Sequence, residues 1–220
     1  MGIVDLLFPK VCIGCGREGE HVCVKCQEKL KKPEEICPSC CKPSLGGWTH
    51  TRCRSRDGMD RLMVGLTYKG LVQMCLKKVK YKSNWDIVES LFKLCMFDMI
   101  PEMAVTYVPM WKKKEQQRGF NQAEMVADFV VSLSGDSLPA QAGRKVSLLE
   151  RCKETKPMFG LSKPERQKNI ENVFRFVGET CPEKVLLVDD VWTTGATMKE
   201  CTKTLKQNGV KIVWGLTLAR

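Results

Sequence analysis

The chain has 220 residues, with 36 Lys and Arg against 25 Asp and Glu, so its formal net charge is +11. This length suits one medium domain, alone or with a small appended module, and the charge favours an anionic partner. It contains no run of about 18 apolar residues, so we expect no membrane insertion. The opening MGIVDLLFPK lacks the basic start and cleavage site of a secretion signal, so we expect a cytoplasmic protein.

Pairs of metal-ligand residues crowd the first quarter of the chain at CxxC spacing, which is typical of zinc sites. Sequential pairing gives two tetrahedral sites, Cys12, Cys15, Cys23 and Cys26 in the first and Cys37, Cys40, His50 and Cys53 in the second. Four protein ligands leave no open position for activated water, so we expect two structural zinc ions. Cys41, beside Cys40, or a solvent-facing His50 would change the second ligand set. We expect His21 at the surface.

We expect the zinc module at residues 1–56 and a second domain at residues 57–220. Seven thiolates and two zinc ions together add a charge of about −3, which brings the module close to neutrality. The positive charge of the second domain gathers in three stretches, 69–82, 112–118 and 144–175. One such stretch is usually a solvated face, whereas three together favour an anionic partner outside the zinc module.

Residues 57–220 alternate between strand and helix patterns. The patterns predict strands at 59–68, 104–109, 146–152, 185–189 and 210–219, and helices at 70–81, 84–100, 121–134 and 196–209. Such alternation predicts an α/β fold in which helices cover both faces of a parallel sheet. The polar stretch 150–169 has two prolines and no clear periodicity, which predicts a long mobile loop.

The stretch VLLVDDVWTTGATM, residues 185–198, carries the most specific chemistry. A buried strand that ends in Asp189 and Asp190 brings both carboxylates to the carboxyl edge of the sheet, where open α/β folds bind ligands. The following TTGAT begins a helix, whose N–H groups and dipole suit a phosphate. Carboxylates repel phosphate, so they would face ribose hydroxyls, with or without magnesium. The alternative is an ordinary capped helix preceded by two acids that have no function. It does not explain why Gly195 and two adjacent carboxylates occur at this point.

This stretch resembles the phosphoribosyl pyrophosphate signature of type I phosphoribosyltransferases. Together with the CxxC pairs, VPMWKKKEQQRGFNQAEMVA and GLSKPERQKNIENVF, it resembles the ComF family over almost the whole chain. The resemblance implies a type I phosphoribosyltransferase fold with an N-terminal zinc finger, and phosphoribosyl pyrophosphate with Mg²⁺ as ligand. It also implies a role in natural competence, where family members assist the uptake of single-stranded DNA, with a competence helicase as a further partner.

The resemblance also implies roles for single residues. Asp189 and Asp190 would hold the ribose hydroxyls and Mg²⁺, and Arg118 would contact pyrophosphate. The 5′-phosphate would lie against Thr193, Thr194, Gly195, Ala196 and Thr197. Arg166 and Asn169 match the family's R..N pattern, and the expected nucleic-acid contacts are Lys112, Lys113, Lys114 and Arg166. Met158 stands after Pro157 where the family usually has glutamine, which puts an amide contact to the substrate in doubt.

Three functions stay open. The first is a phosphoribosyl pyrophosphate-binding protein of DNA uptake, in which any transferase activity would depend on Asp189, Asp190 and Arg118. Purine salvage is disfavoured because hypoxanthine-type relatives place an aspartate where this chain has Thr193, and a hydroxyl is a poor base. The second is a single-stranded DNA adaptor with a non-catalytic pocket, where the candidates for base stacking are Trp111, Phe120, Tyr81 and Phe159. The third is a zinc-ribbon regulator that binds duplex DNA.

Overall fold

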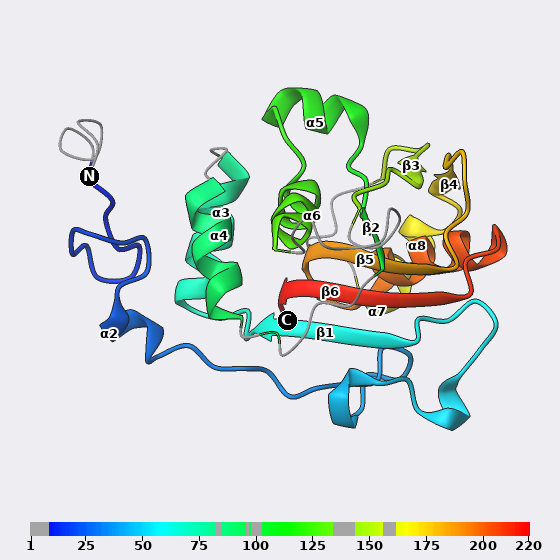
Figure 1. Ribbon diagram of the computed structural model, residues 1–220, viewed down its shortest axis with the longest axis horizontal. Coiled ribbons are helices and arrows are strands. Elements are labelled where there is room, and N and C mark those ends of the chain that lie inside the picture. Colours follow the sequence, from blue (N-terminus) through cyan, green and yellow to red (C-terminus); the bar gives the residue numbers. More distant parts are fainter. Residues whose placement is uncertain (1–8, 82–84, 96, 98–102, 134–143, 156–161) are drawn as a thin grey trace.

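The computed structural model describes residues 9–81, 85–95, 97, 103–133, 144–155 and 162–220 (Figure 1). At its centre is a parallel four-stranded sheet with the strand order β1-β6-β5-β2. These strands are β1 Arg61–Leu66, β2 Ala104–Tyr107, β5 Lys184–Val191 and β6 Ile212–Ala219. Because neighbouring strands are parallel, all four carboxyl ends meet at one edge of the sheet.

Helices cover both faces of the sheet, which confirms the predicted α/β arrangement. One face packs against α3 Leu71–Tyr81, α4 Trp85–Leu94 and α6 Gln122–Ser132, and the other against α7 Lys163–Ile170 and α8 Ala196–Gln207. Strand β5 serves both cores, because Leu186 and Val188 point to the first face and Val185 and Leu187 to the second. None of the described helices has the length and apolar composition that a membrane crossing requires.

The prediction of a mobile loop at residues 150–169 is wrong for the part of this stretch that the structure describes. Its last third forms α7, because Ser162 and Glu165 make a capping box in which the Glu165 carboxylate accepts from the Ser162 N–H at 2.7 Å. Its start belongs to β3 Leu149–Arg151, which pairs antiparallel with β4 Phe174–Phe176. Pro157, Met158 and Phe159 lie outside the described residues.

Two further elements differ from the sequence pattern. The segment after β2, for which no helix or strand was predicted, contains α5 Lys112–Arg118, which ends at Gly119 in the left-handed conformation with φ 81°. Helix α4 ends at Leu94, well before the expected residue 100, and residues 98–102 lie outside the described part.

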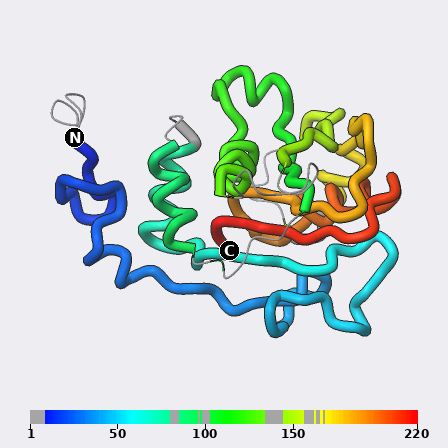
Figure 2. Tube along the Cα trace, in the orientation of Figure 1, coloured from blue at the N-terminus to red at the C-terminus, as the bar shows by residue number. Residues whose placement is uncertain are grey.

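The first ribbon, which holds Cys12 to Cys26, and the second ribbon, which holds Cys37 to Cys53, lie far apart on the α/β part of the molecule (Figure 1). Figures 1 and 2 show the first, with α2 Val24–Gln27, beyond α3, and the second, with η1 Leu45–Gly47 and η2 Thr51–Cys53, below β1. Cys12 and Val22 of the first share a core with α3, and Ile36 of the second joins the core beneath α8. Each ribbon therefore combines its ligand cluster with apolar packing. The domain boundary between residues 56 and 57 stays a prediction.

Candidate zinc centres and ligand site

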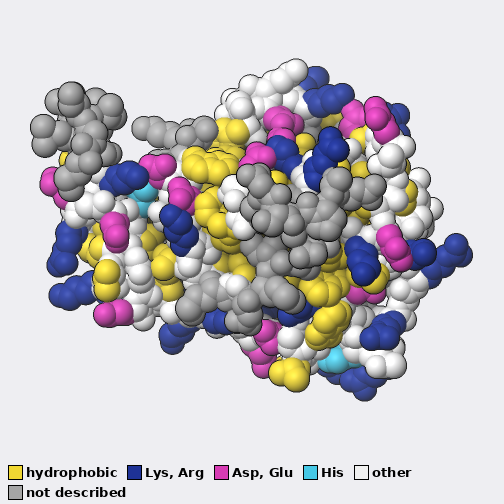
Figure 3. Space-filling view, viewed as in Figure 1, with side chains coloured by type: hydrophobic (Ala, Val, Ile, Leu, Met, Phe, Trp, Pro, Cys, Tyr) yellow, Lys and Arg dark blue, Asp and Glu magenta, His cyan; other side chains and the backbone are white. Residues whose placement is uncertain are grey.

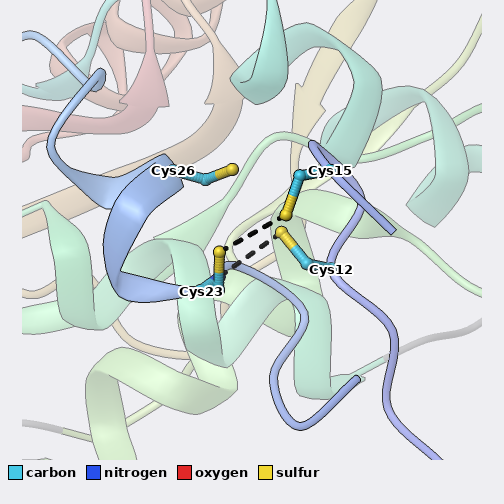
Figure 4. A group of neighbouring side chains, drawn as sticks. All are labelled: Cys12, Cys15, Cys23 and Cys26. Carbon is cyan, nitrogen blue, oxygen red and sulfur yellow. Dashed lines mark hydrogen bonds between the residues drawn. The ribbon is translucent and has the colours of Figure 1, made fainter. Parts of the chain in front are cut away.

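The four cysteines of the first cluster face a common centre (Figure 4). The Sγ atoms of Cys12, Cys15, Cys23 and Cys26 all lie within 4.8 Å of one another. The backbone N–H of Cys23 donates to the Cys12 Sγ at 3.4 Å. Burial raises the pKa of Cys12, but backbone donors at Cys23, Cys15 and Gly14 outweigh it and lower the pKa to about 6. The backbone therefore favours the thiolate, which is the form that binds metal.

The second cluster contains one histidine whose orientation is fixed by its outer nitrogen. The ligand atoms of Cys37, Cys40, His50 and Cys53 lie within 4.8 Å of one another. The His50 Nδ1 lies 3.4 Å from the Cys40 Sγ, and its Nε2 lies 3.0 Å from the carbonyl oxygen of Pro43. Since a carbonyl only accepts, Nε2 carries the proton and Nδ1 offers a lone pair to the centre. Both clusters suit structural zinc.

Cys41 occupies a turn position that is held by glycine in the first ribbon. The Cys41 N–H donates to the Cys37 carbonyl at 2.8 Å, just as the Gly16 N–H donates to the Cys12 carbonyl at 2.9 Å. Both residues have positive φ, 60° at Cys41 and 76° at Gly16. The geometry thus gathers His50, and not Cys41, with the three thiols of the second cluster.

Replacing Cys41 with glycine is expected to stabilise the protein by about 0.5–1 kcal/mol, because glycine adopts positive φ without the penalty of a side chain. Urea unfolding measures this change, and elemental analysis should still find two zinc ions. The matched variant His50→Ala should retain one zinc ion. If Cys41→Gly lost one zinc ion and His50→Ala kept both, the assignment of the two residues would be reversed.

The paired carboxylates lie near the end of β5, which is three residues longer than the expected strand at 185–189 and includes both. Asp189 pairs in register with Thr217 of β6, and its Oδ1 accepts from the Asp190 N–H at 2.9 Å. Side chains alternate along a strand, so Asp189 continues the row of Leu187 toward α8 and Asp190 points to the other face. Two half-buried carboxylates therefore flank one strand end at the carboxyl edge of the sheet.

The loop after β5 leads directly into α8. Trp192 is buried. Its backbone N–H donates to the Ala219 carbonyl at 2.8 Å, which joins the loop to β6. Gly195 is the N-cap of α8 with φ 74°, and a Cβ at this position would lie 2.2 Å from the Trp192 ring. The first N–H groups of a helix have no acceptor within it, and they form an anion site. The structure thus places residues 193–197 at a helix start beside the carboxylates.

Arg151 is a basic neighbour of Asp189 that the sequence analysis did not single out. Burial lowers the pKa of Arg151, and the negative charge of Asp189 opposes this shift. Its guanidinium lies 5.9 Å from the centre of the Phe174 ring on β4. In the sequence Arg151 is one of many bases between residues 144 and 175, so only the tertiary structure distinguishes it.

The RGFNQ motif shapes the corner between β2 and α6. Asn121 caps α6 by accepting from the Ala123 N–H at 3.1 Å, and its amide donates to the Val108 carbonyl at 3.0 Å. Arg118 is half-buried at the end of α5, in the segment that follows the carboxyl end of β2. Since β2 pairs with β5, Arg118 belongs to the same edge of the sheet as the carboxylates.

The predicted nucleic-acid residues belong to two separate elements. Lys112, Lys113 and Lys114 are exposed on α5, which stands above the sheet in Figure 1, and Lys112 pairs with Glu150 at 2.7 Å. Arg166 lies on α7, which packs against α8. Among the candidates for base stacking, Trp111 is half-buried and Phe120 packs against the first core. The side chains of Tyr81 and Phe159 are outside the description.

Known proteins resemble this chain along nearly all of its length. Residues 3–55 match the double zinc ribbon domain family. The chain is 24% identical over 215 residues to "DNA utilization protein YhgH" of Escherichia coli O157:H7, covering 90% of each. It is 25% identical to "Competence protein F" of Haemophilus influenzae, covering 95% of this chain and 90% of the relative. For "Competence protein ComFC" of Bacillus subtilis the identity is 25%, with 86% and 80% covered. These relatives support the resemblance to the ComF family, and the matched double zinc ribbon domain lies in the N-terminal part of the chain.

Proposed function

We propose that this protein serves the uptake or use of external DNA and binds phosphoribosyl pyrophosphate with Mg²⁺ at the carboxyl edge of β5. The names of its relatives, which refer to competence and DNA utilization, support the first part. The junction of β5 and α8 supports the proposed binding of phosphoribosyl pyrophosphate, because two carboxylates at the end of β5 are followed after a short loop by the start of a helix. We place this activity in the cytoplasm, with single-stranded DNA and a competence helicase as partners.

The residues at this junction fit the proposed ligand. The carboxylates of Asp189 and Asp190 would accept hydrogen bonds from ribose hydroxyls and hold Mg²⁺, and the N–H groups at the start of α8 would bind the 5′-phosphate. Magnesium supplies charge neutralisation at pyrophosphate. Arg118 would neutralise the same group from the segment after β2, and the positive charge of Arg151 would favour the ionised form of Asp189. The buried Trp192 anchors this loop to the core and to β6.

Transfer of the phosphoribosyl group to an acceptor would extend this binding function. A second candidate is a single-stranded DNA adaptor with a non-catalytic sugar-phosphate pocket that DNA uptake does not require, and the exposed Thr193 favours it. A threonine hydroxyl does not take up a proton readily near neutral pH, so this position offers no general base.

Transformation of a naturally competent host distinguishes the two candidates. A strain whose protein carries both Asp189→Asn and Asp190→Asn should transform as poorly as a deletion strain, because amides neither bind Mg²⁺ strongly nor carry its compensating charge. Immunoblotting and zinc analysis check that the variant accumulates and folds. Glu179→Gln, which neutralises an exposed carboxylate elsewhere, should transform normally. Normal transformation by the double variant would favour the adaptor.

A further inference from the structure

A cavity lies at the opposite end of the strands from the β5–α8 junction. It has a volume of about 390 Å³ and opens between the second zinc ribbon and the amino edge of the sheet. Its walls include Trp48 of the ribbon and Trp214 of β6, together with Lys184 and Ile212, the first residues of β5 and β6. Its size falls within the range of small-ligand sites, and it shares no lining residue with that junction.

The aromatic wall of this cavity is held by several contacts and is partly exposed. The rings of Trp48 and Trp214 meet edge to face, with centroids 5.1 Å apart. The Arg61 guanidinium lies 5.0 Å from the Trp48 ring and 4.8 Å from the Trp214 ring. Its Nε donates to the Gly46 carbonyl at 2.8 Å, which holds the guanidinium in place. Trp48 nevertheless keeps 43% of its surface exposed. A fixed, exposed indole loses little conformational freedom when a planar ligand stacks on it.

Positive charge surrounds this aromatic wall. Arg54 and Lys184 line the cavity and are exposed, and Arg52 and Arg56 are exposed on the same ribbon segment. The one acid in the described lining, Asp60, accepts from the Lys206 ammonium at 2.8 Å, so its charge is compensated. Figure 3 shows Lys and Arg side chains beside hydrophobic ones over the second ribbon, below β1.

We propose that this cavity binds single-stranded DNA, with one base stacked on Trp48 and the adjoining phosphates held by Arg54 and Lys184. This rests on the proposed role in DNA uptake and gives it a contact surface. A duplex already stacks both faces of each base, so an exposed indole selects single strands. The predicted basic residues on α5 lie beside a half-buried tryptophan, whereas this cavity combines an open ring with charge.

Fluorescence anisotropy with labelled oligo(dT) tests the proposal on the full zinc-loaded chain. Trp48→Ala should weaken binding about tenfold, and Trp48→Phe should restore most of it, because stacking needs an aromatic face. Trp85→Ala removes a tryptophan that is 37% exposed on α4, and it should bind like the wild type. The double variant Arg54→Gln and Lys184→Gln should reduce the salt dependence of binding, whereas Trp48→Ala should leave it unchanged.

A strand with abasic sites decides the question even if Trp48→Ala folds poorly. Wild-type protein should bind the abasic strand about as weakly as Trp48→Ala binds oligo(dT). Equal wild-type affinities for oligo(dT) and the abasic strand would overturn the stacking site, and so would equal oligo(dT) affinities of the wild type and folded Trp48→Ala. Thymidine monophosphate that binds as tightly as oligo(dT) would replace the strand with a nucleotide ligand. Failure of the wild type to bind oligo(dT) would instead remove the DNA part of the proposed function.

Discussion

Replacing Cys12 with serine is expected to remove one of two zinc ions and to lower the free energy of unfolding by about 4 kcal/mol or more. The effect should be large because Cys12 is both a member of the first ligand cluster and part of the core that reaches α3. Loss of metal therefore releases apolar contacts of the α/β part as well as those of the ribbon. Elemental analysis and urea unfolding measure the two effects.

Cys152→Ser is the matched control, because Cys152 is exposed and belongs to neither cluster. It should keep both zinc ions and the stability of the wild type. If Cys12→Ser kept two zinc ions, the first cluster would not be the metal site.

Replacing Gly195 with alanine should destabilise the protein by about 2–4 kcal/mol and abolish binding of phosphoribosyl pyrophosphate. Two effects combine at this position, since φ is 74° and the new Cβ would lie 2.2 Å from the Trp192 ring. Either the ring or the start of α8 must move, and both define the proposed phosphate site. Urea unfolding and calorimetry report the loss of stability and of binding.

Gly119→Ala separates the two effects. Gly119 also has a positive φ, 81°, but no described atom lies within 4 Å of its added Cβ. It should cost only the penalty of the left-handed conformation, about 1–2 kcal/mol. Equal stability losses in the two variants would show that contact with Trp192 does not constrain the loop.

Local patterns predicted those parts of the molecule that local rules determine. The apolar run before Asp189 predicted a buried strand, and CxxC spacing predicted which thiols lie together. The capping box at Ser162 is equally local, but the polar helix behind it has little apolar periodicity and was read as a loop. The β3–β4 pair is short, so the second of its strands carried no recognisable pattern.

Contacts between distant residues could not be predicted from one sequence. Arg151 approaches Asp189 only because β3 and β5 belong to the same fold. Trp48 meets Trp214 only because the second ribbon packs beside β1. The choice between His50 and Cys41 likewise needed the Pro43 carbonyl and the φ of Cys41.

The most direct test of the proposed function is calorimetric titration of the purified chain with phosphoribosyl pyrophosphate and Mg²⁺, repeated with Asp190→Asn. The wild type should bind one ligand per chain and lose that binding when Mg²⁺ is omitted, whereas Asp190→Asn should give no heat of binding. Equal binding heats from the two proteins would contradict a ribose and magnesium site at the end of β5.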